Sequence, residues 1–191
     1  MLEEALRHIS SDVFAPTVER DYLARAWLLR WQQAIPAYLE AQLKSEAEGW
    51  RYQSGEVPFE LPLTDELTLH GRIDRVDAQP DGAVRVLDYK MMDATRLRSK
   101  LKEAGEDVQL ACYAHVYEAD EAAFISIEKD KVIAVEPLQD LPELVQANIE
   151  RLIEVFAQMR SGAALPAHGV DEACTYCEMR GLCRKSEWSA A

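Results

Sequence analysis

The sequence predicts an α/β domain in which a mixed central β-sheet is flanked by α-helices. Two pairs of strand-forming segments, at residues 67–90 and 124–135, have the length and turn chemistry of hairpins. Apolar residues recur at spacings of three and four before the first pair and after the second, as they do in amphipathic helices. With 191 residues, the chain is long enough for one domain with a proper core.

The composition narrows the class of protein. It is 48% hydrophobic and 29% charged, which is ordinary for a globular protein. No run approaches the ~18 apolar residues of a membrane span, and the acidic start Met1-Leu2-Glu3-Glu4 is not a signal peptide. We therefore expect a cytoplasmic location and no membrane partner. The formal net charge of −13 argues against broad electrostatic binding of nucleic acid.

The first 50 residues are expected to form one long amphipathic helical segment. Pro36 should kink or break it, and Gly49 should end it. We interpret its apolar stripe as core packing, with docking on another domain as the alternative. The stripe comprises Leu23, Trp27, Trp31, Ile35, Tyr38, Leu39 and Leu43.

An edge strand is expected from Glu56 to Leu63, because each of its two prolines removes a ladder donor. Glu56 and Glu60 share one face of this strand and are expected to be exposed edge charges. Glu56 is also a candidate outer carboxylate of a metal site.

The segment from residue 67 to residue 90 should form a hairpin around the turn Gln79-Pro80-Asp81-Gly82. Pairing then brings residue 74 opposite residue 87 or 88, so that Asp74 and Asp88 lie side by side, with Lys90 on the same face as Asp88. Two adjacent carboxylates repel each other unless a cation lies between them, and oxygen ligands suit Mg²⁺ or Mn²⁺. A lysine beside them can stabilise a developing oxyanion or orient a water molecule. Asp77 and Asp81 are expected to be solvated charges.

A basic helix or loop should follow, from Ala94 to Lys102. Its cations place positive charge next to the two carboxylates, opposed only by Asp93. The candidate nucleic-acid contacts are Arg96, Arg98, Lys100 and Lys102. Gly105 should end this segment, and Asp107 should cap a helix from Val108 to Glu118. That helix places Gln109, Cys112, Tyr113 and Val116 on one face, with Cys112 as a small core residue.

Phe124–Ile127 and Val132–Val135 should form a second hairpin that completes the sheet. Asp140 and Pro142 then predict the start of a structural helix that ends at Ser161-Gly162. The tail holds three clustered cysteines, Cys174, Cys177 and Cys183, which in a reducing cytosol usually indicate a metal. A zinc site completed by His168, free thiols, and a disulfide formed during handling all stay open.

Three blocks in this order resemble the RecB/AddB-type exonuclease domains of the PD-(D/E)XK nuclease superfamily. They are Gly71-Arg72-Ile73-Asp74 with Asp88-Tyr89-Lys90, then Gln109 with Tyr113, then the three cysteines. The resemblance covers roughly residues 56–188 and implies a restriction-endonuclease-like core. It implies that Asp74, Asp88 and the main-chain carbonyl of Tyr89 hold Mg²⁺ or Mn²⁺, and that the catalytic residues are Asp74, Asp88, Lys90, Gln109 and Tyr113.

The same resemblance implies a DNA substrate, a helicase domain or subunit as partner, and exonuclease action in recombination and double-strand-break repair. It also implies that the three cysteines, with one early cysteine, hold a [4Fe–4S] cluster. No cysteine precedes Cys112, so we expect an incomplete cluster and a chain that is a fragment of a larger polypeptide. Two residues depart from the family's pattern: Met91-Met92 replaces the usual Thr-Gly, and Gln42 stands about where relatives carry Glu.

We expect a single domain with three parts: a helical segment at residues 1–55, a nuclease core at 56–165 and a cysteine-containing tail at 166–191. Two other functions stay open. A catalytically silent DNA-binding or scaffold module would keep the nuclease fold, and a small zinc-stabilised interaction domain would bind metal at the cysteines alone.

Overall fold

A computed structural model of the chain describes residues 1–102, 107–138, 140–164, 174 and 177–183. The chain divides into two compact units, Met1–Ile153 and Glu154–Ala191. Gly105 and His168, both named above, lie outside the described residues. No helix in the described part of the chain is long and apolar enough to cross a membrane.

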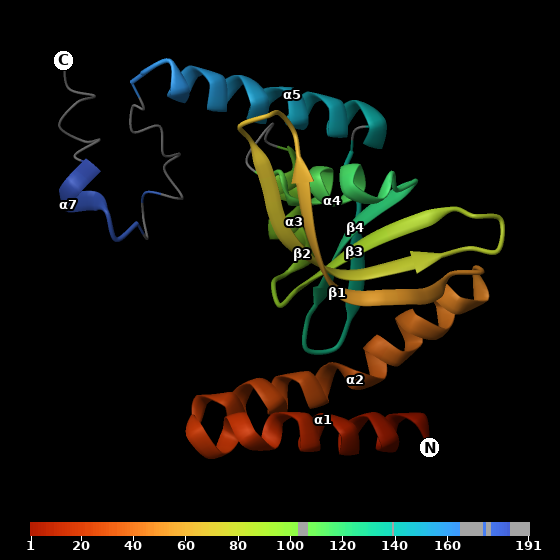
Figure 1. The fold of residues 1–191 in the computed structure, drawn as a ribbon. Helices are drawn as coiled ribbons and strands as arrows, with labels where there is room; N and C mark the ends of the chain where they lie inside the picture. The colour runs from red at the N-terminus through yellow and green to blue at the C-terminus, as the bar shows by residue number, and fades with distance from the viewer. Residues whose placement is uncertain (103–106, 139, 165–173, 175–176, 184–191) are drawn as a thin grey trace. The chain divides into compact units, whose positions relative to one another are not determined.

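The first unit is built on a five-stranded sheet in the order β1-β2-β3-β4-β5 (Figure 1). The strands are β1 (Arg51–Pro62), β2 (Thr68–Ala78), β3 (Val84–Lys90), β4 (Glu121–Ile127) and β5 (Val132–Val135). β3 and β4 are parallel, and the other neighbouring pairs are antiparallel. The predicted mixed sheet, the edge position of β1 and the hairpin of β4 and β5 are confirmed.

The hairpin of β2 and β3 closes through the predicted turn. Gln79 N–H donates to the carbonyl of Ala83, and Gly82, at φ +99°, donates to the carbonyl of Gln79. Asp81 is exposed at this turn and accepts the N–H of Ala83, as expected for a solvated turn residue. The prediction for Asp77 is wrong, because the ladder places it opposite Arg85 on a face that α2 covers, where it is fully buried.

Two helices, α1 (Leu2–Arg20) and α2 (Leu23–Ala47), replace the single predicted helix, and α2 covers one face of the sheet (Figure 1). The break falls at Asp21 because this residue is extended and its carboxylate accepts the N–H of Leu23. Pro36 lies inside α2 and does not end it. Gly49, at φ +100°, follows the end of α2 as predicted.

The apolar stripe of α2 is only partly core. Ile35 is fully buried, whereas Leu23, Trp27 and Leu43 are 50%, 53% and 52% exposed, so the core interpretation is wrong for these three. The reason is that the buried face of α2 is centred on two small residues, Ala24 and Ala34, and on Ile35.

The other face of the sheet carries α3 (Ala94–Lys102) and α4 (Gln109–Tyr117), which form the crossover between the parallel strands β3 and β4 (Figure 1). The predicted basic segment is therefore a helix. The main core lies under these helices and includes Ile73, Val76, Val86, Leu97, Leu110 and Phe124. Asp140 precedes α5 (Leu141–Arg160), whose first residues pack against this core and which ends just before Ser161-Gly162, as predicted. The second unit contains α7 (Arg180–Cys183).

Candidate active site

Asp74 and Asp88 come together where the β2–β3 ladder ends. The last pair in this ladder is Arg75 with Leu87, so residue 74 lies level with residue 88, as the hairpin predicts. The main-chain N–H of Tyr89 donates to Asp74 Oδ2 at 2.9 Å. This bond crosses from one strand to the other beyond the last ladder pair, and it fixes the Asp74 carboxylate beside the backbone of residues 88–89.

Asp88 is a buried carboxylate with one poorly satisfied oxygen. Its side chain is 2% exposed, and Lys90 Nζ lies 2.6 Å from Oδ2 as an ion pair. Apart from this contact, no donor among the described residues meets Asp88 Oδ2. Burial raises the pKa of Asp88; Lys90 opposes the shift, while the nearby charges of Asp74 and Asp107 add to it.

Lys90, Gln109 and Tyr113 form a chain of hydrogen bonds that leads away from Asp88. Lys90 Nζ donates to Gln109 Oε1 at 2.8 Å, and Gln109 Nε2 donates to the Tyr113 hydroxyl at 2.7 Å. The backbone of Gln109 is fixed at the start of α4, because Asp107 Oδ1 accepts the main-chain N–H of Gln109 at 2.9 Å. Burial raises the pKa of the Tyr113 phenol, so it stays protonated at neutral pH.

Aromatic rings line the base of this chain. The Phe59 ring meets the Tyr113 ring edge to face, with 5.9 Å between the ring centroids. Lys90 Nζ lies 5.3 Å from the centroid of Phe124, a residue of the neighbouring parallel strand. Phe59 covers Gly71 so closely that a Cβ at residue 71 would lie 2.7 Å from the ring. These contacts fix the position of the Tyr113 phenol, which accepts the hydrogen bond from Gln109.

The donor set fits a divalent cation. Two carboxylates, one of them with a buried oxygen that meets no described donor except Lys90, lie beside the peptide of Tyr89. Hard oxygen ligands of this type suit Mg²⁺, which commonly takes only one or two carboxylates from the protein. Glu56 lies level with Asp74 on the neighbouring strand, between the pairs Gly55–Arg75 and Val57–Ile73, but its carboxylate is exposed and pairs with Arg72 at 3.2 Å. Within the described ranges no group of three His, Cys, Asp or Glu side chains gathers as a metal site.

The basic helix α3 follows β3 after a short link. Arg96, Arg98 and Lys102 are exposed, and Lys100 is half-buried. The helix therefore offers cationic side chains close in sequence to Lys90, on a chain whose overall charge is −13. Cys112, expected in the core, is a buried free thiol of α4.

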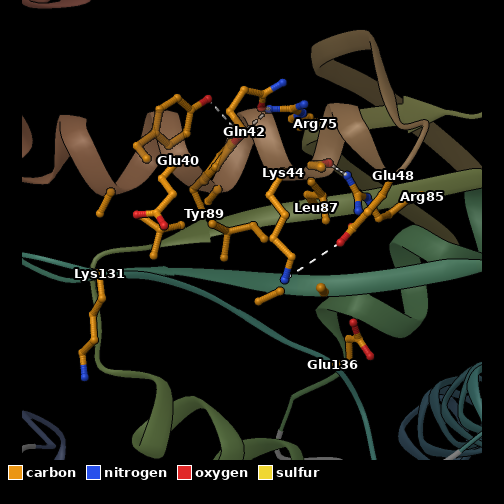
Figure 2. A pocket seen from close by; sticks show the side chains of 18 of the residues that line it. Glu40, Gln42, Lys44, Glu48, Arg75, Arg85, Leu87, Tyr89, Lys131 and Glu136 are labelled. Atoms are coloured by element: carbon orange, nitrogen blue, oxygen red, sulfur yellow. Dashed lines mark hydrogen bonds and ion pairs between the residues drawn. The ribbon is translucent and has the colours of Figure 1, made fainter. Parts of the chain in front are cut away.

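A second polar cluster lies on the opposite face of the sheet, and the sequence analysis missed it. Figure 2 shows its members Gln42, Arg75 and Arg85 beside a pocket of about 390 Å³ between α2 and the sheet. Asp77 is bound there by Arg75 at 2.6 Å and by Arg85 at 2.7 Å. Gln42 of α2 accepts from Arg75 at 2.7 Å. The register that sets residue 74 beside residue 88 also sets Asp77 opposite Arg85, so this opposite-charge pair was the signal that could have revealed the cluster.

In the second unit, Cys174 and Cys183 are half-buried and Cys177 is exposed. The N–H of Cys177 donates to the carbonyl of Cys174 at 3.4 Å. The zinc ligand considered from the sequence, His168, lies outside the described residues.

Comparison with known proteins places this geometry in a family. No curated protein matches the chain. Among solved structures, that of SSO0001 aligns with 92% of this chain and 73% of its own, at 20% identity and a TM-score of 0.41. SPO1766, a protein of unknown function from Silicibacter pomeroyi, aligns with 66% of this chain and 88% of its own, at 12% identity and a TM-score of 0.25.

The family model of the PD-(D/E)XK nuclease superfamily matches residues 1–184, nearly the whole chain. This match spans both strands of the Asp74–Asp88 hairpin and the crossover helices that carry Gln109 and Tyr113. With its mixed α/β sheet and this family match, the chain belongs to the PD-(D/E)XK nuclease superfamily.

Proposed function

We propose that the chain is a metal-dependent deoxyribonuclease that hydrolyses phosphodiester bonds at Asp74, Asp88 and Lys90. The observation that carries this proposal is the buried Asp88 carboxylate, which lies level with a second carboxylate, Asp74, and has Lys90 as its ion-pair partner at 2.6 Å. Burying one of two adjacent carboxylates costs stability, and such like-charged pairs cluster at functional sites.

Asp74, Asp88 and the main-chain carbonyl of Tyr89 would hold Mg²⁺ or Mn²⁺. A divalent ion, when bound, polarises the phosphate and lowers the pKa of water. The protein's part is to hold both carboxylates in place. Asp74 is fixed by the N–H of Tyr89, and Asp88 is fixed by burial and by its ion pair with Lys90.

Lys90 is positioned to bind the phosphate or the attacking water. Its ammonium group has three N–H donors. One side of the group faces Asp88 and another donates to Gln109, which leaves donor capacity for a phosphate oxygen or a water molecule. Its side chain is 30% exposed, so a substrate can reach it. Gln109 and Tyr113 hold the ammonium in place, and they act as positioning residues.

The finer parts of the proposal come from the resemblance to RecB/AddB-type domains. They are exonuclease action on linear DNA in recombination and repair, a helicase domain or subunit as partner, and contacts of α3 with the DNA backbone. We also propose that Cys174, Cys177 and Cys183 are ligands of a [4Fe–4S] cluster.

A catalytically silent DNA-binding or scaffold module is the second candidate. Two observations favour it: the net charge of −13, and the lack, among the residues the structure describes, of any group of three His, Cys, Asp or Glu side chains that could hold a metal. Such a module would retain the fold and the basic helix α3 but would not cleave DNA.

The test is degradation of linear single- and double-stranded DNA with Mg²⁺ or Mn²⁺. The wild-type protein is compared with Asp88→Asn, and with Asp81→Asn as a matched control, because Asp81 is an exposed carboxylate of the same hairpin. We expect activity in the wild type and in the control, and none in Asp88→Asn. Calorimetric titration with Mn²⁺ should show binding in the same two proteins.

Three results would contradict parts of the proposal. Cleavage that survives Asp88→Asn would refute the assigned site. Binding of Mn²⁺ at Asp88 without any cleavage, together with binding of DNA, would support the silent module. Equal cleavage of covalently closed circular DNA and linear DNA would refute the exonuclease assignment and leave the nuclease assignment intact.

A further inference from the structure

Tyr89 connects the two faces of the sheet. Its neighbours Asp88 and Lys90 point toward the candidate active site, so strand alternation directs the Tyr89 side chain to the opposite face. There its hydroxyl accepts from Arg75 Nη1 at 3.1 Å and lies 3.5 Å from the hydroxyl of Tyr38 in α2. Its main-chain N–H, by contrast, donates to Asp74 Oδ2 at the active-site face.

The partner of this phenol is itself held firmly. The Arg75 side chain is 8% exposed, and its Nε donates to Asp77 Oδ1 at 2.6 Å while its Nη1 donates to Gln42 Oε1 at 2.7 Å. Burial alone would lower the pKa of Arg75, but Asp77 and Tyr89 outweigh that effect and raise it. Arg75 is therefore a charged donor whose Nε and Nη1 are both engaged, on the face of the sheet opposite the candidate active site.

The cluster also ties α2 to both strands. Arg85 binds the other oxygen of Asp77, and its Nη2 also donates to the hydroxyl of Ser45 at 2.6 Å. The guanidinium of Arg85 stacks over the Trp50 ring, with 4.3 Å to the centroid. Figure 2 shows Gln42, Arg75 and Tyr89 gathered under α2. The position of Tyr89 is thus set by side chains of α2 and β2 together.

Backbone pairing alone would hold residue 89 on the side of β4 and leave it weakly held on the side of β2. The ladder from β2 ends at Leu87, whereas the parallel ladder from β4 continues as far as Lys90. Residues 88–90 consequently have no ladder pairs with β2. Beyond Leu87, the contacts that tie Tyr89 to β2 among the described residues are the Asp74 carboxylate at the front and Arg75 at the back.

We propose that Arg75 and the phenol of Tyr89 are positioning residues for the candidate metal site, acting from the opposite face of the sheet. This inference rests on the proposed function. The phenol fixes the rotation of residue 89 about the strand axis. That rotation sets where its N–H meets Asp74 and where its carbonyl, the proposed third ligand, is directed. The burial of Tyr89 raises the pKa of its phenol, which therefore remains a neutral hydroxyl across the working pH range.

The experiment compares the wild type with Tyr89→Phe, which removes only the hydroxyl, and with the matched control Tyr38→Phe. The control removes the weaker 3.5 Å contact of the same hydroxyl and leaves Arg75 in place. We expect Mn²⁺ affinity, measured by calorimetry, to fall about tenfold in Tyr89→Phe, the lower end of the usual effect of outer-shell partners. The kcat of DNA cleavage should fall in parallel while KM for DNA is unchanged. Tyr38→Phe should show a smaller loss of both.

A second readout does not need metal or activity. Hydrogen exchange of the residue 89 amide, followed by NMR in the metal-free protein, should be faster in Tyr89→Phe than in the wild type. The amides of β4 serve as an internal reference, because their ladder to β3 is unchanged.

The outcomes separate this inference from the proposed function. The inference would be overturned if Tyr89→Phe left both the Mn²⁺ affinity and the amide exchange unchanged. It would also be overturned if Tyr89→Phe lowered the melting temperature with unchanged Mn²⁺ affinity, because that effect is purely structural. If the wild type binds Mn²⁺ but does not cleave DNA, nuclease function fails and the affinity comparison still decides the inference. If the wild type binds no Mn²⁺, the proposed function fails at the metal site, and the inference is overturned with it whatever the amide exchange shows.

Discussion

Replacing Asp88 by Asn should make the metal-free protein more stable. The substitution keeps the shape of the side chain and removes its charge. Because burial raises the pKa of Asp88 despite Lys90, the folded state favours the neutral form of this side chain. An amide supplies that neutral form at every pH. It also removes the repulsion between Asp88 and Asp74, which lie level with each other on neighbouring strands.

The expected change in the free energy of unfolding follows from the interactions that the Asp88 carboxylate gains and loses on folding. A buried charged acceptor whose hydrogen bonding is incomplete costs about 1–3 kcal/mol or more. Against this stands the ion pair with Lys90, which is 30% exposed, and such partly exposed pairs contribute about 0–1 kcal/mol. We therefore expect Asp88→Asn to stabilise the metal-free protein by roughly 1–2 kcal/mol. For a chain of this length that corresponds to an increase in Tm of about 2–8 °C.

The pH and the concentration of Mn²⁺ should each change the difference in stability between Asp88→Asn and the wild type. A side chain with a raised folded-state pKa contributes stability that is present below its unfolded value, 3.8 for Asp88, and is lost as pH rises through the folded value. The advantage of Asp88→Asn should accordingly be large at neutral pH and shrink as pH falls toward 3.8. Saturating Mn²⁺, at about 100 times its Kd, should stabilise the wild type alone by about 2.7 kcal/mol and reverse the order.

The assay is thermal unfolding followed by circular dichroism, in EDTA and in Mn²⁺, at several pH values. Asp81→Asn is the control, because this exposed carboxylate should show neither effect. A variant less stable than the wild type in EDTA at neutral pH would refute the reasoning that Asp88 is an unfavourably buried charge. A stability difference that does not depend on pH would refute the assignment of its cause to ionisation.

Three further predictions concern the surroundings of the site and the helical layer. Gly71→Ala should destabilise the protein by about 1–3 kcal/mol in urea unfolding, because the new Cβ would lie 2.7 Å from the Phe59 ring. Neutralising the exposed Arg96 and Arg98 together should reduce the magnitude of the slope of log K against log[salt] for duplex DNA by about 1.8, measured by fluorescence anisotropy. Ser10→Ala should cost about 1–3 kcal/mol, also in urea, because it leaves the Trp31 N–H, now bonded to Ser10 at 2.6 Å, without its acceptor.

Much of the site could be predicted because it depends on local patterns. The turn at residues 79–82 fixes the register of the hairpin, and that register brings Asp74 level with Asp88. The period of a strand places Lys90 on the face of Asp88, and helical spacing places Gln109 and Tyr113 one turn apart. The hydrogen bond from Lys90 to Gln109 joins the hairpin to α4. It depends on how α4 crosses the sheet, and sequence spacing alone does not predict that crossing.

The errors have one physical origin, which is tertiary packing that overrides local pattern. Leu23 and Trp27 fit an apolar stripe, but the helix presents its small residue Ala24 to its neighbours, so the large side chains remain half exposed. Pro36 fits a helix break, yet the break falls at Asp21, whose carboxylate accepts the N–H of Leu23, the first residue of the next helix. Asp77 fits a rim charge, yet α2 covers it.

Asp77 and Asp88 together provide the sharpest test, because they are buried carboxylates of the same sheet with opposite surroundings. Asp77 is fully buried and each of its oxygens meets an arginine, at 2.6 and 2.7 Å. Removing this charge leaves two buried guanidinium groups unneutralised, so Asp77→Asn should destabilise the protein by about 3–5 kcal/mol. Asp88→Asn, the same chemical change, should stabilise it. Urea unfolding in EDTA at neutral pH measures both. If both substitutions destabilise, then Asp88 is part of a structural ion pair like Asp77, and the argument that its buried carboxylate is kept for a cation fails.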